Sequence, residues 1–476
     1  MSPRRPTMVN VIQGLSTRWL PFADTATADL PLSRLLRLSL FQISVGMSVV
    51  LLTGTLNRIM VIELGQAVWL VSLMISLPLL AAPARALIGF RSDYHKSLLG
   101  WRRVPYLWVG TLMQFGGLAI MPFALIVMTE VQAGPAWVGP AASMLAFLLV
   151  GAGMHTTQTA GLALATDLAN EDNRSRVVAL LYVMLLVGMI ASSAVFAAVL
   201  EDFNYVRLIK VIQGAAVLTV VFNFVALWKQ EARQPHLTRP DRKRPQFMAI
   251  WREFSRANRA TRLLVAVALG TMGFSMQDIL LEPYGAEILA MSVSQTTALT
   301  GIFGAGMLVA FAFASKTLRG HVDPVRFAAY GAVIGIFAFA AVVFAAPLES
   351  TFLFRAGTAL IGLGGGLFAV GTLTAAMLQG NEENNGLALG AWGAVQATAA
   401  GIGVFVGGAL RDLISGFASS GQLGEVMNSP ITGYSVVYHV EIFILFAALV
   451  AIGPLVKQPS IRSSSSSNFQ LADFPG

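Results

Sequence analysis

Long apolar runs recur along most of this chain, and they constrain its fold more than any other feature. Each run has about 20 residues or more, enough for an α-helix to cross the hydrocarbon core of a bilayer. Backbone groups in lipid must satisfy their own hydrogen bonds, so such runs are expected to be helices. The sequence therefore predicts an all-α membrane protein with twelve transmembrane helices, at 38–61, 67–88, 106–128, 140–166, 177–200, 208–228, 263–285, 297–315, 327–346, 351–378, 387–411 and 434–456.

Composition supports this class and argues against others. Of the 476 residues, 55% are hydrophobic and 12% are charged, whereas soluble proteins have roughly 25% charged residues. The chain has no cysteine, which excludes disulfides, thiolate metal sites and thiol nucleophiles. It also lacks a P-loop, a serine triad, an HExxH helix and a dinucleotide-binding fingerprint, so we do not expect an enzyme.

Basic residues predict the orientation of the helices. The net charge of +8 would suggest a nucleic-acid partner in a soluble protein, but here it collects in loops, and no such partner is expected. Cytoplasmic loops of membrane proteins are enriched in Lys and Arg. With both termini in the cytoplasm, 26 of the 32 Lys and Arg residues fall on that side, in the segments 1–37, 89–105, 174–176, 229–262, 316–326 and 457–476. We therefore predict that both termini are cytoplasmic.

The chain divides into two sets of six runs. The predicted parts are a cytoplasmic segment (1–37), a first six-helix half (38–228), a basic cytoplasmic linker (229–262), a second six-helix half (263–456) and a disordered cytoplasmic tail (457–476). The linker carries ten bases and three acids. It is either a solvated connection or a contact for anionic lipid headgroups.

An internal repeat supports this division. Residues 151–173 align without gaps with residues 362–384 at an offset of 211, which pairs Gly151 with Gly362, Gly153 with Gly364, and "NEDN" with "NEEN". These segments are the fourth and tenth runs. They would be equivalent helices of two parallel halves, the layout of the major facilitator superfamily.

The loop after the second run resembles the loop motif of that superfamily. It reads "GFRSDYHKSLLGWRRVP", and the matching positions are Gly89, Asp93, Gly100, Arg102 and Arg103. An acid just past a helix end can pair with bases of the neighbouring half and so act as a cytoplasmic gate. The alternative is a charged turn that only fixes topology.

Polar residues inside the seventh run raise the question of function. Gln277, Asp278 and Glu282 precede Pro283 and Gly285, where the helix is expected to break. Charges in hydrocarbon are costly and need partners. The first run carries Asn57 and Arg58 at the corresponding place, so Arg58 is predicted to pair with Asp278 or Glu282. These five polar residues form either a structural link between the halves or a contact for substrate or pigment.

A histidine inside the fourth run is a second candidate. The neutral imidazole of His155 can ligate the magnesium of a chlorophyll-type pigment, with Gln158 one turn later; the alternative is a hydrogen-bonded packing residue. His439, near the predicted outer end of the last run, is a less favourable ligand candidate.

Glycines four apart, at 362–366, 386–390 and 403–407, indicate close helix packing.

Several segments resemble one family of membrane proteins. Residues 30–47, 49–65, 85–108, 113–125 and 277–285 resemble the PucC and LhaA family of purple photosynthetic bacteria. This bacteriochlorophyll delivery family is a branch of the major facilitator superfamily. Residues 21–42 resemble the branch that serves the core antenna, LH1.

The resemblance implies assembly of light-harvesting complexes in the bacterial inner membrane, including its intracytoplasmic photosynthetic part. Such a protein would supply bacteriochlorophyll, as non-covalent cargo, to nascent antenna polypeptides, or would protect them until they carry pigment; it needs no protein-bound metal. Partners would be antenna polypeptides, bacteriochlorophyll synthase and the membrane insertion machinery. Two alternatives remain: a proton-coupled transporter of a small molecule or tetrapyrrole that uses Asp278 or Glu282, and an assembly scaffold without pigment.

Overall fold

A computed structural model provides the structure of the protein. It describes residues 30–81, 88, 91–92, 95, 100–129, 135, 137–170, 174–231, 258–317, 323–379 and 385–456. Most of the predicted N-terminal segment, most of the basic linker and the predicted tail lie outside these described residues.

Every predicted apolar run coincides with a helix, and the described residues contain no strand. Eleven helices in this part of the chain are long and apolar enough to cross a membrane, and the second run is the shorter α4. The bounds are α2 (Leu32–Leu38) and α3 (Leu40–Val49), α4 (Val68–Leu80), α6 (Val104–Thr129), α7 (Val138–Leu168), α8 (Arg174–Val199), α9 (Tyr205–Leu227), α11 (Asn258–Ser275), α12 (Leu281–Glu287), α13 (Val293–Thr317), α14 (Pro324–Ala345), α15 (Thr351–Gln379), α16 (Asn385–Ser419) and α17 (Ile431–Ile452). The all-α prediction is confirmed.

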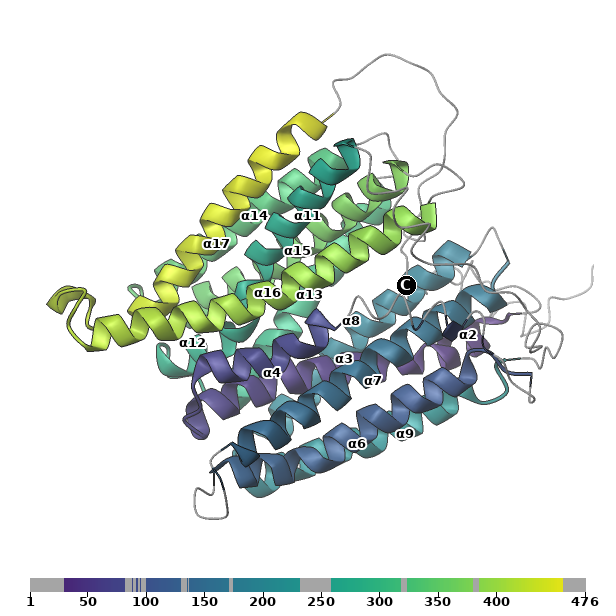
Figure 1. Ribbon diagram of the computed structural model, residues 1–476, viewed down its shortest axis with the longest axis horizontal. Helices are drawn as coiled ribbons and strands as arrows, with labels where there is room; N and C mark the ends of the chain where they lie inside the picture. The colour runs from purple at the N-terminus through teal and green to yellow at the C-terminus, as the bar shows by residue number, and fades with distance from the viewer. Residues whose placement is uncertain are drawn as a thin grey trace, which may run out of the picture.

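The helices form two groups that lie side by side (Figure 1). The purple and blue helices α2 to α9 make one group, and the teal to yellow helices α11 to α17 make the other. The groups meet where α4 packs on α16 and α8 packs on α13. These pairs come from the second and eleventh runs and from the fifth and eighth.

The repeat in the sequence corresponds to equivalent packing in the two groups. A Cβ atom on Gly153 would lie 2.5 Å from Gln114 N, and one on Gly364 would lie 2.8 Å from Gly331 O. These glycines therefore let α7 approach α6 and α15 approach α14 at backbone distance. The third and fourth runs thus pack as the ninth and tenth do.

The first and seventh runs are both irregular helices. The first continues from α3 through two π-helical stretches, η2 (Val50–Leu56) and η3 (Ile59–Glu63). The seventh changes from α11 to a 3₁₀ turn, η6 (Met276–Ile279), and then to α12. The expected break at Pro283 and Gly285 is therefore wrong, because both residues lie within α12. Proline is tolerated in a first helical turn, where its missing N–H has no intrahelical acceptor.

Candidate functional site

A polar junction joins the first and seventh runs at their irregular turns. The Asn57 side chain donates through Nδ2 to the backbone oxygens of Asp278 at 3.4 Å and Ile279 at 3.1 Å. Carbonyl groups become available there because the 3₁₀ turn interrupts the α-helical hydrogen-bond ladder. The sequence placed Asn57 and Arg58 at the position corresponding to Gln277 and Asp278, and in the structure Asn57 contacts the backbone of the seventh run.

Two acids of this junction are held by neutral partners. Glu282 is 4% exposed, and its Oε1 accepts a hydrogen bond from Thr300 Oγ1 of α13 at 2.9 Å. Asp278 accepts a hydrogen bond from the side chain of its neighbour Gln277. Gly54 leaves the space that Thr300 fills, since a Cβ at Gly54 would overlap the Thr300 hydroxyl. The junction therefore includes the eighth run as well as the first and seventh.

Arg58 has a different partner from the predicted one. It is buried and forms an ion pair with Glu63, at the end of the same helix. Residues five apart lie close to one face of a π-helix, which has more residues per turn than an α-helix. The prediction that Arg58 pairs with Asp278 or Glu282 is wrong, because the π-helical stretch brings Glu63 to the face that Arg58 occupies.

A further acid, which is buried, was missed by the sequence reasoning. Glu441 of α17 is 0% exposed, and neither carboxylate oxygen has a hydrogen-bond partner among the described residues. Its helix, α17, packs against the 3₁₀ turn η6 that holds Gln277 and Asp278. The signal was present in the sequence, since Glu441 is the one acid within the apolar run 434–456.

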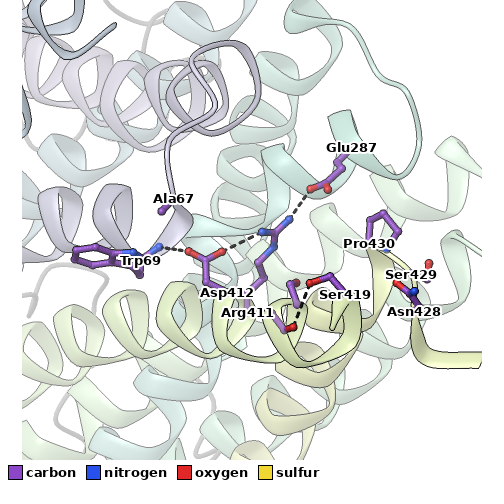
Figure 2. Close-up of a pocket in the computed structure, with 11 residues that line it drawn as sticks. Ala67, Trp69, Glu287, Arg411, Asp412, Ser419, Asn428, Ser429 and Pro430 are labelled. Atoms are coloured by element: carbon purple, nitrogen blue, oxygen red, sulfur yellow. Dashed lines mark hydrogen bonds and ion pairs between the residues drawn. The ribbon is translucent and has the colours of Figure 1, made fainter. Parts of the chain in front are cut away.

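A cavity of about 540 Å³ lies at the predicted outer end of the bundle (Figure 2). Arg411 of α16 lies between two carboxylates, 2.7 Å from Glu287 and 3.0 Å from Asp412. Asp412 also accepts a hydrogen bond from the backbone N–H of Trp69, at the start of α4, at 2.8 Å. This site was not predicted because its residues come from three distant parts of the chain.

The histidine candidate lies on α7. His155 is partly buried, and its backbone carbonyl accepts the Thr159 hydroxyl at 2.7 Å. Gln158 is partly buried as well and donates to Gln42 Oε1 of α3 at 3.5 Å. Gln158 therefore links the fourth run to the first.

The arginines of the predicted gate-like loop bind within the first group of helices. Asp167 of α7 lies 3.2 Å from Arg102 and 3.0 Å from Arg103. The Glu231 carboxylate accepts the backbone N–H groups of Arg102, Arg103 and Val104 at 2.7 to 3.1 Å. Gly100 has a left-handed φ of 78°, which suits glycine.

Two positions of the loop motif, Gly89 and Asp93, lie outside the described residues. The pairing of Asp93 with the other half stays a prediction.

Comparison with known proteins decides the family. The profile of the PUCC protein family matches residues 55–459, which includes the polar junction and most of the helices. This chain belongs to the PUCC family. The resemblance found in the sequence is thus confirmed.

Relatives in this family cover nearly the whole chain. "Protein PucC" of Rhodovulum sulfidophilum is 56% identical over 85% of this chain and 91% of its own. An "Uncharacterized protein in puhA-bchM intergenic region" of Rhodobacter capsulatus is 50% identical over 98% of both chains. A more distant relative, "Bacteriochlorophyll synthase 44.5 kDa chain" of Rhodobacter capsulatus, is 26% identical over 90% of this chain and 97% of its own.

Solved structures show the fold. The nucleoside transporter NupG (D323A mutant) superposes with a TM-score of 0.65 at 14% identity, over 89% of this chain and 100% of its own. A bacterial homologue of the lysosomal transporter Spinster, in an inward-facing conformation, also scores 0.65 at 13% identity, over 91% of this chain and 96% of its own. The PUCC-family chain is therefore a multi-pass membrane protein with the fold of major facilitator transporters. Family and fold together point away from an enzyme.

Proposed function

We propose that this protein is an assembly factor for light-harvesting complexes. It supplies bacteriochlorophyll to nascent antenna polypeptides in the inner, photosynthetic membrane, with both termini in the cytoplasm. The match to the PUCC family across residues 55–459 is the observation that carries the proposal, because the sequence resemblance associates this family with antenna assembly. Further proposed partners are bacteriochlorophyll synthase and the membrane insertion machinery.

The resemblance of residues 21–42 to the core-antenna branch makes LH1 the proposed client. This can be tested by deleting the gene in a photosynthetic host and recording the near-infrared bands of LH1 and LH2. A selective loss of the LH1 band supports the assignment, and a selective loss of the LH2 band contradicts it.

The polar junction gives the proposal its candidate residues. Asn57, Arg58, Gln277, Asp278 and Glu282 lie where helices of both groups meet, so a cargo bound there would contact both. His155 and Gln158 supply a second set of polar groups inside the bundle. We propose that these residues contact the pigment or transmit its binding between the helix groups.

The decisive experiment is purification in mild detergent from a host that makes bacteriochlorophyll. An absorption spectrum and mass spectrometry of the purified protein would show what accompanies it. A pigment band in fixed proportion to protein supports the carrier function. Antenna polypeptides without pigment would instead support the scaffold alternative. If neither pigment nor antenna polypeptides accompany the protein, both functions are contradicted.

We predict that Arg58→Ala reduces antenna accumulation. The substitution removes a buried cation and leaves the partly exposed Glu63 carboxylate without its partner, which is destabilising, though less so than for a fully buried charge. The measurement is the near-infrared spectrum of cells at equal protein level. Arg207→Ala is the matched control, because Arg207 pairs with Asp202 at an exposed position. A spectrum like that of the wild type for Arg58→Ala would refute the role of Arg58.

Proton-coupled transport is the second candidate, and one observation favours it. Glu282 and Glu441 are buried acids, and Asp278 adjoins them. In the described part of the chain, Asp278 and Glu282 accept side-chain hydrogen bonds from neutral residues. Acids of this kind in membrane spans often carry protons. Asp278→Asn should then abolish uptake of a tetrapyrrole or small molecule into vesicles at unchanged protein level, and intact uptake would exclude this mechanism.

A further inference from the structure

One histidine faces outward from the helix bundle within the membrane span. His439 lies in α17 and is exposed, within the candidate span Ile431–Leu455. It is eight residues after Ile431, so it lies about 12 Å along the helix from that end. A polar ring at this depth on a lipid-facing surface needs a partner or a function.

The contacts of this ring indicate which nitrogen carries the proton. His439 Nδ1 lies 2.7 Å from the backbone oxygen of Ser435, one turn earlier, and 3.4 Å from the hydroxyl of the same residue. A carbonyl oxygen only accepts hydrogen bonds, so Nδ1 must be the donor. In the neutral ring, Nε2 then keeps its lone pair, and the described residues supply no hydrogen-bond donor to it. Histidines that ligate metals are held in this way, by a hydrogen bond from the other nitrogen to a backbone carbonyl.

The surface beside His439 suits a large flat apolar ligand. On α17, Phe443, Phe446 and Val450 continue the same stripe and are 76%, 52% and 75% exposed. The neighbouring helix α14 presents Phe337 and Phe344, which are 68% and 59% exposed.

A ring contact shows which part of α14 lies beside His439. Phe339 of α14 lies against Tyr438 of α17, with ring centroids 6.2 Å apart, so α14 passes His439 at the level of Phe337 and Phe339.

A groove begins one turn from the imidazole. It has a volume of about 530 Å³ and includes Ser435, the residue that orients His439, together with Val343 and Pro347 beyond it. A ligand held at His439 could extend an apolar substituent or a polar edge into this groove.

We infer that His439 Nε2 is an axial ligand for the magnesium of a bacteriochlorophyll that lies on the lipid-facing surface of α14 and α17. The inference rests on the proposed pigment-carrier function and names its binding site. It adds a second ligand position to the one predicted at His155, whose Nε2 is buried, whereas His439 is exposed. A surface site lets the pigment pass directly to a single-span polypeptide through the lipid.

The test compares variants purified from a host that makes bacteriochlorophyll. His439→Ala should lower the pigment-to-protein ratio at least tenfold. Phe123→Ala is the control, since Phe123 is an exposed residue of α6, in the other group of helices, and this variant should keep the pigment-to-protein ratio of the wild type. Imidazole added to His439→Ala should restore pigment binding by occupying the vacated ligand position.

Resonance Raman spectra provide a second readout, because the core vibrations of the macrocycle report whether magnesium has an axial ligand. The wild type should show five-coordinate magnesium with an imidazole ligand. Unchanged pigment content and unchanged spectra in His439→Ala would overturn the inference and leave the carrier function intact. Loss of pigment in His155→Ala alone would also overturn it. A wild-type protein without pigment would refute the inference and the carrier function together.

Discussion

Two adjacent glycines in α6 allow a sharp test of the helix packing. Gly116 and Gly117 are neighbours in "QFGGLA", but they face different surroundings. A Cβ atom at Gly117 would lie 2.7 Å from both Ala146 O and Val150 N of α7. A Cβ atom at Gly116 would have no other atom within 4 Å. Substitution by alanine therefore adds the same methyl group to a closed interface in one case and to open space in the other.

The expected difference in stability between the two variants follows from two contributions. Alanine is favoured over glycine inside a helix by about 1 kcal/mol, and both variants gain this. At Gly117 the new methyl group meets backbone atoms, which cannot rotate away, so α7 must move by about 0.7 Å to restore ordinary contact at about 3.4 Å. Overpacking of this kind costs about 1–3 kcal/mol. The Gly117→Ala variant should thus be less stable than Gly116→Ala by about 1–3 kcal/mol.

The assay is unfolding of the purified protein in mild detergent by increasing sodium dodecyl sulfate, followed by tryptophan fluorescence. Gly116→Ala should unfold at the same or a higher denaturant fraction than the wild type, and Gly117→Ala at a lower one than Gly116→Ala. Equal midpoints for the two variants would show that α6 and α7 are not packed at backbone distance.

Two further substitutions probe hydrogen bonds to helix starts, measured with the same unfolding assay. Glu231→Gln should lower stability by about 1–2 kcal/mol, because the Glu231 carboxylate accepts N–H groups at the start of α6 and hydrogen bonds to a charged acceptor are stronger than those to a neutral one. Asp202→Asn, at an exposed position, serves as the control. Equal effects of the two substitutions would contradict the role of Glu231. Asp412→Ala should cost about 1 kcal/mol by removing the acceptor of the Trp69 N–H at the start of α4, and it should shift the fluorescence of Trp69. An unchanged midpoint and unchanged emission would show that this contact between the helix groups contributes nothing.

Most of the fold could be predicted because membrane helices leave a local signal. An apolar run of sufficient length specifies a helix whatever its neighbours are, since the lipid provides the same apolar surroundings everywhere. The repeat identified Gly153 and Gly364 as equivalent positions, and the structure gives both the same packing role. Close packing needs a small residue at a fixed helical position, which a sequence displays directly.

The candidate site was predicted only in part, because it depends on irregular backbone. The sequence indicated Asn57, Asp278 and Glu282 from their polarity in apolar runs. It assigned the wrong partner to Arg58, since a π-helical turn changes which residues share a face. Glu441 was overlooked although it is an acid in an apolar run, because its place beside the seventh run is a tertiary contact.

The amino-acid sequence by itself determined the class of the protein, the number of helices and the family. These properties depend on the length of apolar runs and on residue identity, both of which are local. Only the tertiary structure decided that Gly117 faces a helix and Gly116 does not, that Arg58 pairs with Glu63, and that His439 turns one nitrogen to its own helix and leaves the other for lipid. The first depends on the rotation of one helix relative to its neighbour, the second on a π-helical turn, and the third on the side-chain conformation of His439; none of these is displayed by the residue types alone.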